Sequence, residues 1–283
     1  EMLSFDPTNW ARDQMIRLTE LSKKYHDTLI DSGHINEATG HLNMWIKDRL
    51  KDKKPKNIQI RTVGEKARAV VSPGYNSFAN FDVLQRTMQE IATINNERGE
   101  DATPVQLTQV TLSETMIRAT LVDMGNPIEI PDKNGNYNGD IYYPMITVKN
   151  SEVGSAAFSL DGGVFRYLCS NLHTMGSILR KIHSGARLEE GIFTQKTLEK
   201  QTDLWLSILR DGIRAIEKPE LFAETIDGIA LAKETPIGSP TTTVKKIGEK
   251  MKLSDAEINA IVDAMSNDRT MSDSDRGTLF AVT

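Results

Sequence analysis

The residues that most often carry catalysis or bind metal ions are few and scattered in this sequence. There is one cysteine, Cys169, and the five histidines are not paired at a metal-ligand spacing; no HExxH or CxxC motif occurs. The motifs GxGxxG and GxxxxGK[ST] are also absent, so neither a dinucleotide-binding fold nor a phosphate-binding loop is indicated. We therefore expect no metal site and no cofactor.

Two weaker patterns come closest to a chemical site. Asp132 to Asn136 resembles the opening of a calcium loop, but Tyr143 stands where the twelfth position needs an acid, so we interpret the segment as a turn. Cys169 with His173 or His183 could form a nucleophile and its base, but a third, orienting group is missing. A cysteine that ends an apolar strand is usually a small core residue. We expect a buried, inert Cys169 and a protein that is not an enzyme.

The basic residues form two clusters that the overall net charge of −5 conceals. Trp45–Arg68 carries nine basic and three acidic residues, and Val164–Arg187 carries four basic residues and none that is acidic. A solvated surface usually alternates the signs of its charges, so these clusters suggest a binding surface. An alternative holds for Arg180 and Lys181, because cations at the C-terminal end of a helix are stabilised by its dipole.

Such clusters fit a groove that follows a single-stranded phosphate backbone while bases stack on aromatic side chains. The candidate nucleic-acid-binding residues are Lys51, Lys53, Lys54, Lys56, Arg61, Lys66, Arg68, Arg166, Arg180, Lys181 and Arg187. The candidate stacking residues are Tyr75, Tyr142, Phe165 and Tyr167. Phe165 and Tyr167 alternate with Arg166 along one strand, so the three cannot all line one groove. A place in the core is the commoner alternative for each aromatic residue.

Hydrophobic periodicity predicts the order of the elements. Helices are expected at 8–30, 44–50, 78–97, 170–183, 192–216, 219–231, 241–252 and 254–266, with Ser32-Gly33 ending the first. Strands are expected at 58–63, 67–71, 105–112, 115–122, 142–148, 156–160 and 164–169. Gly64-Glu65 and Asp161-Gly162-Gly163 are predicted to be hairpin turns, and Asn150-Ser151 with Gly154 another turn.

This order predicts an α+β protein with a mixed, mainly antiparallel sheet built from hairpins, packed helices and a helical C-terminal lobe. We place a core domain at 1–187 and the lobe at 188–283. The composition, 39% hydrophobic and 26% charged, allows a sizeable core. The sequence contains no apolar run of membrane-spanning length and no second cysteine for a disulfide, which favours a reducing cytoplasm and no membrane.

Three strings carry a resemblance to a known family. The string NSEVGSAAFSLDGGVFRYLCSN, the preceding ARAVVSPGYNSFANFDVL and the final GTLFAVT resemble the phage- and plasmid-like family called domain of unknown function 932. The likeness covers roughly 58–283. It departs from the family at Leu172, where glycine is common, and at Thr283, beyond which the family's last helix normally continues. The resemblance implies a phage, prophage or plasmid setting and no particular catalytic activity.

These patterns lead to three hypotheses. The first is a non-enzymatic protein that binds and anneals single-stranded DNA in recombination, as a ring-forming or filamentous homo-oligomer in the bacterial host cytoplasm. The second is a structural or protein-interaction component of a phage. The third is duplex binding by a helix-turn-helix at Val244–Met265, which we discount because its second helix is acidic and has no Lys or Arg to read a groove.

Overall fold

The computed structural model describes residues 6–19, 21–50, 58–72, 75, 78–130, 141–166, 171–181, 195–267 and 276–282, with backbone alone at 49–50, 171–181, 195–202, 219 and 282. Its elements, in chain order, are β1 (Asp6–Pro7), α1 (Asn9–Thr19), α2 (Lys23–Asp31), α3 (Ile35–Leu50), β2 (Gln59–Val63), β3 (Lys66–Val71), α4 (Asn80–Arg98), β4 (Val105–Leu112), β5 (Ile117–Asp123), β6 (Ile128–Glu129), β7 (Ile141–Asn150), β8 (Phe158–Arg166), β9 (Asn171–Lys181), α5 (Gln195–Arg214), η1 (Ala215–Glu217), η2 (Pro219–Leu221), α6 (Ala223–Glu234), α7 (Pro240–Lys250), α8 (Asp255–Asn267) and η3 (Leu279–Val282).

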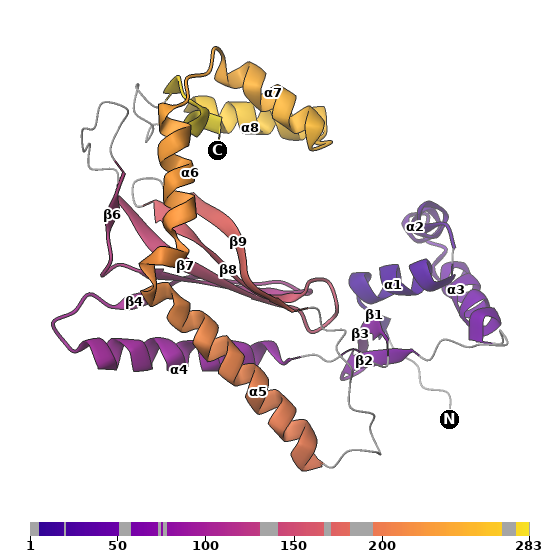
Figure 1. The fold of residues 1–283 in the computed structure, drawn as a ribbon. Coiled ribbons are helices and arrows are strands. Elements are labelled where there is room, and N and C mark those ends of the chain that lie inside the picture. Colours follow the sequence, from indigo (N-terminus) through magenta and orange to yellow (C-terminus); the bar gives the residue numbers. More distant parts are fainter. Residues whose placement is uncertain are drawn as a thin grey trace.

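The N-terminal elements form a small unit of their own, seen at the right of Figure 1. Strands β2 and β3 make an antiparallel hairpin, and β1 adds to β3 in parallel, so the sheet order is β1-β3-β2. Helix α1 packs on β3 and on α3, while α2 packs on α3. Ala11 and Ile16 of α1 and Ala67 and Ala69 of β3 are buried, which gives the unit a core of small and branched side chains.

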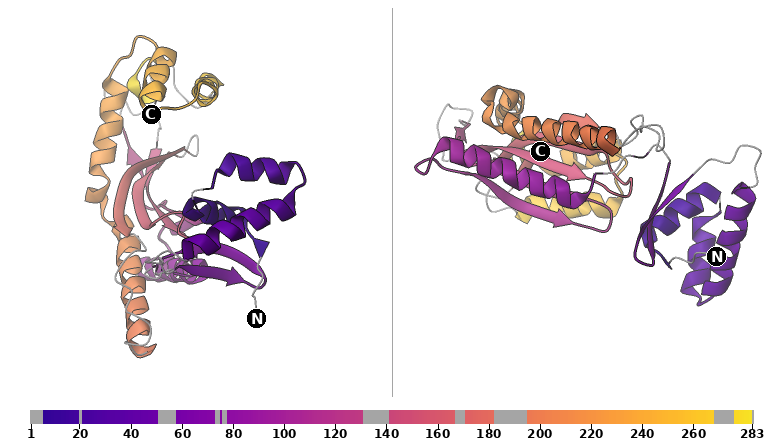
Figure 2. Two further views of the ribbon diagram at one scale, coloured as in Figure 1. Left: turned by 90° about the vertical axis from the view of Figure 1, so that its right-hand side faces the viewer. Right: turned by 90° about the horizontal axis from the view of Figure 1, so that it is seen from below.

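A larger antiparallel sheet occupies the centre of the molecule, in the order β4-β5-β7-β8-β9 with β6 paired to β7. Figures 1 and 2 show α4 and α5 side by side against one face of this sheet. From that face Leu121, Ile146 and Leu160 pack with Ile94 of α4 and Leu209 of α5. Burying each such side chain stabilises the fold by roughly 1.5–3 kcal/mol.

A glycine lets α5 approach the sheet closely. An added Cβ at Gly212 would lie 2.6 Å from Cδ1 of the fully buried Leu160 on β8. Any larger residue at this position would push the helix away from the strand or displace Leu160. The contact fixes the height of α5 above the sheet.

The predicted fold class is confirmed: the chain is α+β with a mainly antiparallel sheet and packed helices. The hairpin about Gly64-Glu65 is confirmed, with Gly64 at a φ of 58°, as is the hairpin of β4 and β5. Helix α4 also lies where it was predicted. The division at 187 stays a prediction, because residues 182–194 lie outside the described residues; α5 and α6 contribute to the same core as the sheet.

Two predictions around β8 were wrong. Asp161-Gly162-Gly163 is not a turn but the middle of the nine-residue strand β8, where the register with β9 shifts at the glycines. Residues 170–183 do not form a helix, because Asn171–Lys181 is strand β9. Gly162 and Gly176 lie opposite each other, and paired glycines in a strand mark a bulge as readily as a turn. Pairing with β8 therefore outweighed the helical spacing of the apolar residues.

The N-terminal helices also differ from the prediction. Residues 8–30 form two helices, because Ser22 caps α2 by accepting a hydrogen bond from the Tyr25 N–H and so starts a new helix. Ser32-Gly33 ends α2 as expected, with Gly33 at a φ of 82°. Helix α3 begins nine residues before the predicted 44.

A buried ion pair joins α4 to the end of β5. Arg98 donates two hydrogen bonds of 2.7 and 2.8 Å to Asp123, which has no exposed surface, and also contacts Glu217 at 3.3 Å. Burial alone would raise the pKa of Asp123, but the hydrogen bonds from Arg98 and Asn126 hold it below its usual value. Because the folded pKa is the lower one, this stabilisation is present above the unfolded pKa of 3.8 and is lost as the pH falls through the folded pKa.

We expect Arg98→Ala to lower the free energy of unfolding by about 3–5 kcal/mol, because it leaves the Asp123 carboxylate buried and unpaired. Chemical denaturation measures the loss. Adding Asp123→Asn to Arg98→Ala removes the uncompensated charge and should recover part of it. If Arg98→Ala alone were no more costly than the double variant, the unpaired charge of Asp123 would not be the cause of the loss.

Candidate nucleic-acid interface

Several predicted contact residues lie outside the described residues, and the rest fall into separate places. Those outside are Lys51, Lys53, Lys54, Lys56, Arg187 and Tyr167, and Cys169 and His183 lie outside as well. Arg61, Lys66 and Arg68 lie on β2 and β3, and Arg166 ends β8. Arg180 and Lys181 are described by their backbone, at the end of β9. Since β9 is a strand, the helix dipole no longer explains this pair of cations.

Burial contradicts the predicted nucleic-acid contacts of two residues, Arg166 and Tyr142. Arg166 is 2% exposed, and its guanidinium carbon lies 5.1 Å from the centroid of the Phe280 ring, so it cannot reach a phosphate. Tyr142 is completely buried in the main core, beneath the ammonium group of Lys233 at 5.6 Å. A base cannot stack on a ring that is already enclosed on all sides. Both residues stabilise the packing of η3 and α6 against the sheet.

Arg68 and Tyr75 are held by other parts of the protein. Arg68 donates to the Glu152 carboxylate at 2.9 Å and to the backbone carbonyl of Glu114 at 3.1 Å, so its charge is already paired. The Tyr75 hydroxyl donates to the carbonyl of Ser151 at 2.7 Å, and its ring packs beside Gly154. The prediction that these two residues contact nucleic acid directly is therefore not supported by their contacts. They position the segment that follows β7.

That segment, Asn150–Ser155, is the point where the N-terminal unit meets the large sheet. The Trp10 indole N–H and the Gln14 side-chain amide both donate to the carbonyl of Val153, at 2.9 and 3.2 Å. Gln14 also accepts the backbone N–H of Val70, so it links the segment to β3. Gly154 has a φ of 76°, which confirms the predicted turn with a conformation that favours glycine.

Glu152 connects three elements through its two carboxylate oxygens. One accepts from Arg68 of β3, and the other accepts the backbone N–H of Asn80 at 2.6 Å. Helix α4 has Ala79 at its N-cap, with no side-chain cap of its own, so Glu152 supplies the acceptor that this helix end needs. The negative charge also lies favourably at the positive end of the helix dipole.

Beside this segment the sheet carries a row of register partners that includes three basic residues. Arg118 of β5 lies opposite Lys149 of β7, Lys149 lies opposite Ser159 of β8, and Ser159 lies opposite Arg180 of β9. Arg118 is exposed, and Lys149 is about a quarter exposed and pairs with Asp161. Three interstrand spacings make this row about 14 Å long. We call these four positions the sheet row.

The sequence analysis did not find Arg118 or Lys149. It searched for basic residues that are close along the chain, whereas these two stand alone in strands 31 residues apart and are brought together by the register of β5 and β7. Tyr143 of β7 and Phe165 of β8 are also register partners, at the other end of β7 from Lys149, and both are partly exposed. Only the alternation of strand residues, combined with the correct pairing, would have revealed the row.

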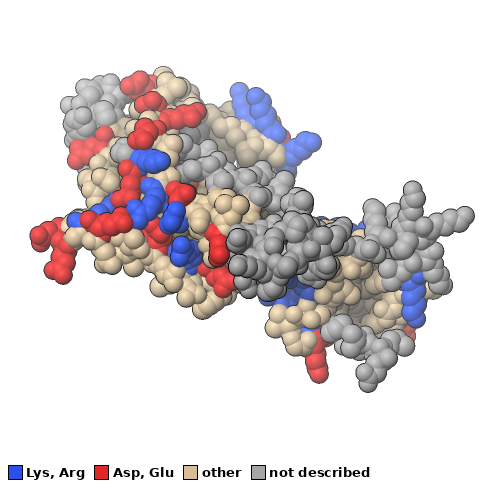
Figure 3. Space-filling view, turned by 60° about the horizontal axis from the view of Figure 1, so that its bottom comes forward, with Lys and Arg blue, Asp and Glu red and all other residues tan. Residues whose placement is uncertain are grey.

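Other surfaces fit a nucleic acid less well. Figure 3 shows positive and negative side chains interleaved over the face that α4 and α5 form. Arg214 there binds Glu90 at 2.6 Å and Glu97 at 2.8 Å, and these acids raise its pKa. Such paired charges leave little net field for a polyanion.

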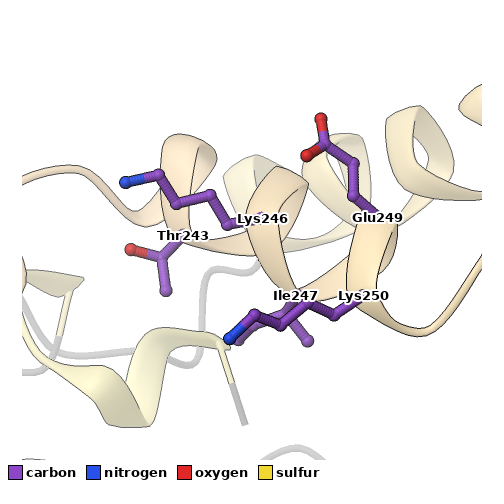
Figure 4. Close-up of a pocket in the computed structure, with 5 residues that line it drawn as sticks. All are labelled: Thr243, Lys246, Ile247, Glu249 and Lys250. Carbon is purple, nitrogen blue, oxygen red and sulfur yellow. The ribbon is translucent and has the colours of Figure 1, made fainter.

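A hollow of about 440 Å³ lies along α7, lined by Thr243, Lys246, Ile247, Glu249 and Lys250. Figure 4 shows these side chains spread around the helix: Lys246 and Glu249 point to one side, and Ile247 and Lys250 to the other. Polar groups that diverge in this way do not converge on one ligand. We assign the hollow no site.

The described residues contain no group of three His, Cys, Asp or Glu side chains placed to hold a metal ion. Within them, no helix combines the length and apolar character that a membrane span requires. No protein-family model, curated protein or solved structure matches the chain significantly. The resemblance to domain of unknown function 932 therefore stays a prediction.

We expect Glu152→Ala to loosen the N-terminal unit from the sheet, because Arg68 loses its acceptor and α4 loses its cap. Hydrogen bonds to charged groups are worth about 1.5–3 kcal/mol each. Hydrogen exchange of the β3 amides, compared with those of β7, measures the effect. Glu114→Ala is the matched control, because Arg68 bonds to the backbone carbonyl of Glu114 and not to its exposed side chain. Unchanged protection of β3 in Glu152→Ala would contradict the role of Glu152.

Proposed function

We propose that the protein binds single-stranded nucleic acid, with DNA as its substrate, and anneals it without catalysis. The observation that carries the proposal is the sheet row, in which Arg118 is exposed and Arg180 lies at the other end, across Lys149 and Ser159. Lys149 is paired with Asp161, so Arg118 and Arg180 are the residues of the row that we propose contact phosphates. Basic groups spaced across strands can follow a phosphate backbone without touching base edges, which leaves the bases free to pair.

The contact between Arg68 and Glu152 supports the idea of one continuous surface. The contact joins β3, which carries the exposed Lys66, to Glu152, which lies three residues after Lys149 and just beyond the end of β7. The basic hairpin and the end of β9, which were separate clusters in the sequence, thus both lie near the Asn150–Ser155 segment. Tyr143 and Phe165 are the partly exposed aromatic pair on the same strands, and Phe165 keeps its proposed stacking role.

We further propose that the protein works in phage or plasmid recombination in the bacterial cytoplasm, as a homo-oligomer. Strand β4 supports the oligomer: it is an edge strand of eight residues, and none of them is charged, Pro or Gly. Val110 and Leu112 on it are 45% and 69% exposed. Natural edge strands are usually protected by Lys, Pro or a covering segment, so an unprotected edge fits pairing with a second copy.

The nucleic-acid proposal predicts a salt-dependent affinity. For single strands, the slope of log affinity against log salt is about −0.7 for each phosphate neutralised. Arg118→Gln with Lys66→Gln should therefore flatten the slope by about 1.4 and weaken binding to every sequence alike. Fluorescence anisotropy of a labelled single-stranded oligonucleotide, at low and at physiological salt, measures this.

Arg210→Gln with Lys245→Gln is the matched control: it also removes two positive charges, from a half-exposed position on α5 and an exposed position on α7. The Arg210–Asp211 pair that it breaks adds little stability. Arg180→Gln should weaken binding more than Lys181→Gln, because Arg180 is in register with Ser159 of the sheet row and Lys181 with the buried Phe158. An unmodified protein that does not bind the oligonucleotide even at low salt would favour the phage structural or interaction role instead.

The oligomer proposal predicts that Val110→Lys with Leu112→Lys lowers the assembly state, because charged side chains disfavour pairing at a strand edge. Light scattering at micromolar concentration, with and without oligonucleotide, measures the mass. Leu231→Lys with Met251→Lys is the control, since these exposed side chains lie on α6 and at the C-cap of α7, away from the strand edge. A strict monomer under all these conditions would contradict the proposal.

A further inference from the structure

Helices α2 and α3 are joined in the manner of a helix-turn-helix. Only Ser32, Gly33 and His34 separate them, and Gly33 adopts a φ of 82°. A connection of three or four residues that contains glycine is typical of this motif, whose second helix enters the major groove of duplex DNA. The nine-residue α2 would be the first helix and the sixteen-residue α3 the second.

The inner side of α3 is fixed by packing. Ala38 and Leu42 are buried at 1% and 6% exposure, and α1 and α2 both pack on this helix. The Tyr25 hydroxyl lies 3.2 Å from Nδ1 of His41, and the two rings stack with their centroids 5.9 Å apart. These contacts hold α3 at a set angle to α2, as a rigid reading helix requires.

The outer side of α3 carries a polar stripe: Asn36, Gly40, Asn43 and Lys47. Their spacing of four, three and four residues places them on one side of a helix, opposite Ala38 and Leu42. All four are exposed, and the side chains of Asn36, Asn43 and Lys47 make no hydrogen bond or ion pair within the described part of the chain. Glu37 lies off the stripe and within 3.9 Å of His34.

The chemistry of the stripe fits the edges of base pairs. Asparagine donates and accepts in the pattern that adenine N6 and N7 present in the major groove. Asn36 and Asn43 are seven residues apart, about 10 Å along the helix axis, which spans about three base pairs. An added Cβ at Gly40 would meet nothing within 4 Å, so the backbone between the two asparagines is open to a close approach.

The charge of the surrounding unit fits a polyanion. Residues 6–71 contain 13 Lys and Arg against 9 Asp and Glu, a net charge of +4, whereas the rest of the chain contributes −9 to the total of −5. Lys24 is exposed in the first turn of α2, at the positive end of the helix dipole. In a helix-turn-helix the first helix crosses the phosphate backbone, which is where such a lysine is useful.

We propose that the α2–α3 unit binds duplex DNA, with α3 in the major groove and Asn36 and Asn43 at base edges. Lys47 and Lys24 contact phosphates on either side of the groove. This site is separate from the sheet row, and it does not depend on the binding of single strands. It differs from the discounted helix pair α7 and α8, whose second helix is acidic.

Gly40→Glu is the sharpest test. Glutamate replaces a glycine that has open space around it in the middle of a helix, so thermal stability should be kept or increased. The added side chain and charge should nevertheless reduce duplex affinity at least tenfold, because they stand between α3 and the groove. Gly228→Glu is the matched control, since Gly228 is also exposed on a helix with nothing within 4 Å of an added Cβ.

The measurement uses the full chain and the duplexes of about 30 base pairs that it retains from a randomised pool, with single strands of the same sequences measured in parallel. Asn36→Ala with Asn43→Ala should abolish the base preference at the selected positions. Lys47→Gln should weaken all duplexes alike and flatten the salt slope by about 0.9. Lys245→Gln should leave duplex binding unchanged.

Each outcome decides the proposal. It is overturned if the unmodified protein retains no duplex at low salt, or if Gly40→Glu binds duplex as well as Gly228→Glu does. In either case α3 is left as an interaction helix for another protein. If Gly40→Glu loses duplex binding but still binds single strands, the result supports the site on α3. If the unmodified protein binds duplex but not single strands, the result rejects the sheet row and leaves the proposal for α3 unaffected.

Discussion

The carboxylate of Glu152 is the contact on which the relation between the two parts of the molecule depends. One oxygen holds Arg68 of the N-terminal sheet, and the other caps the first turn of α4, which has no capping side chain of its own. An acceptor that serves a helix end and a guanidinium together must be placed accurately. The Asn150–Ser155 segment achieves this with a glycine at positive φ and with bonds from Trp10 and Gln14 to one carbonyl.

Local patterns were sufficient to predict the elements whose signals lie within a few residues. The β2–β3 hairpin follows from a glycine turn between two branched segments, and α4 follows from a clear helical period. Strands β8 and β9 could not be predicted in the same way. The glycines at 162 and 163 indicate a turn when they are considered alone, and they become a bulge only because Gly176 lies opposite. Long-range pairing decided the structure of both segments.

The candidate site also divides into features that local sequence patterns predicted and features that depend on long-range pairing. Basic clusters in the sequence did point to β3 and to the end of β9, but Arg68 and Arg166 are occupied in ion pairing and in packing. Arg118 and Lys149 were missed because the sheet register, and not the sequence, makes them neighbours. The stripe on α3 was missed for a different reason. The prediction began this helix at residue 44, so Asn36, Gly40 and Asn43 were not seen as one side of a helix.

The distribution of charge suggests how the two proposed surfaces would act together. A protein with a net charge of −5 repels nucleic acid at a distance, so productive contact is limited to places where positive groups are exposed. The N-terminal unit has a net charge of +4, and the sheet row lies beside the segment that anchors this unit. If the protein anneals single strands as proposed, the duplex product is the form of DNA that the stripe on α3 would bind. Glu152 links the N-terminal unit, which carries α3, to the segment beside the sheet row, so one chain would present a surface for each form of DNA.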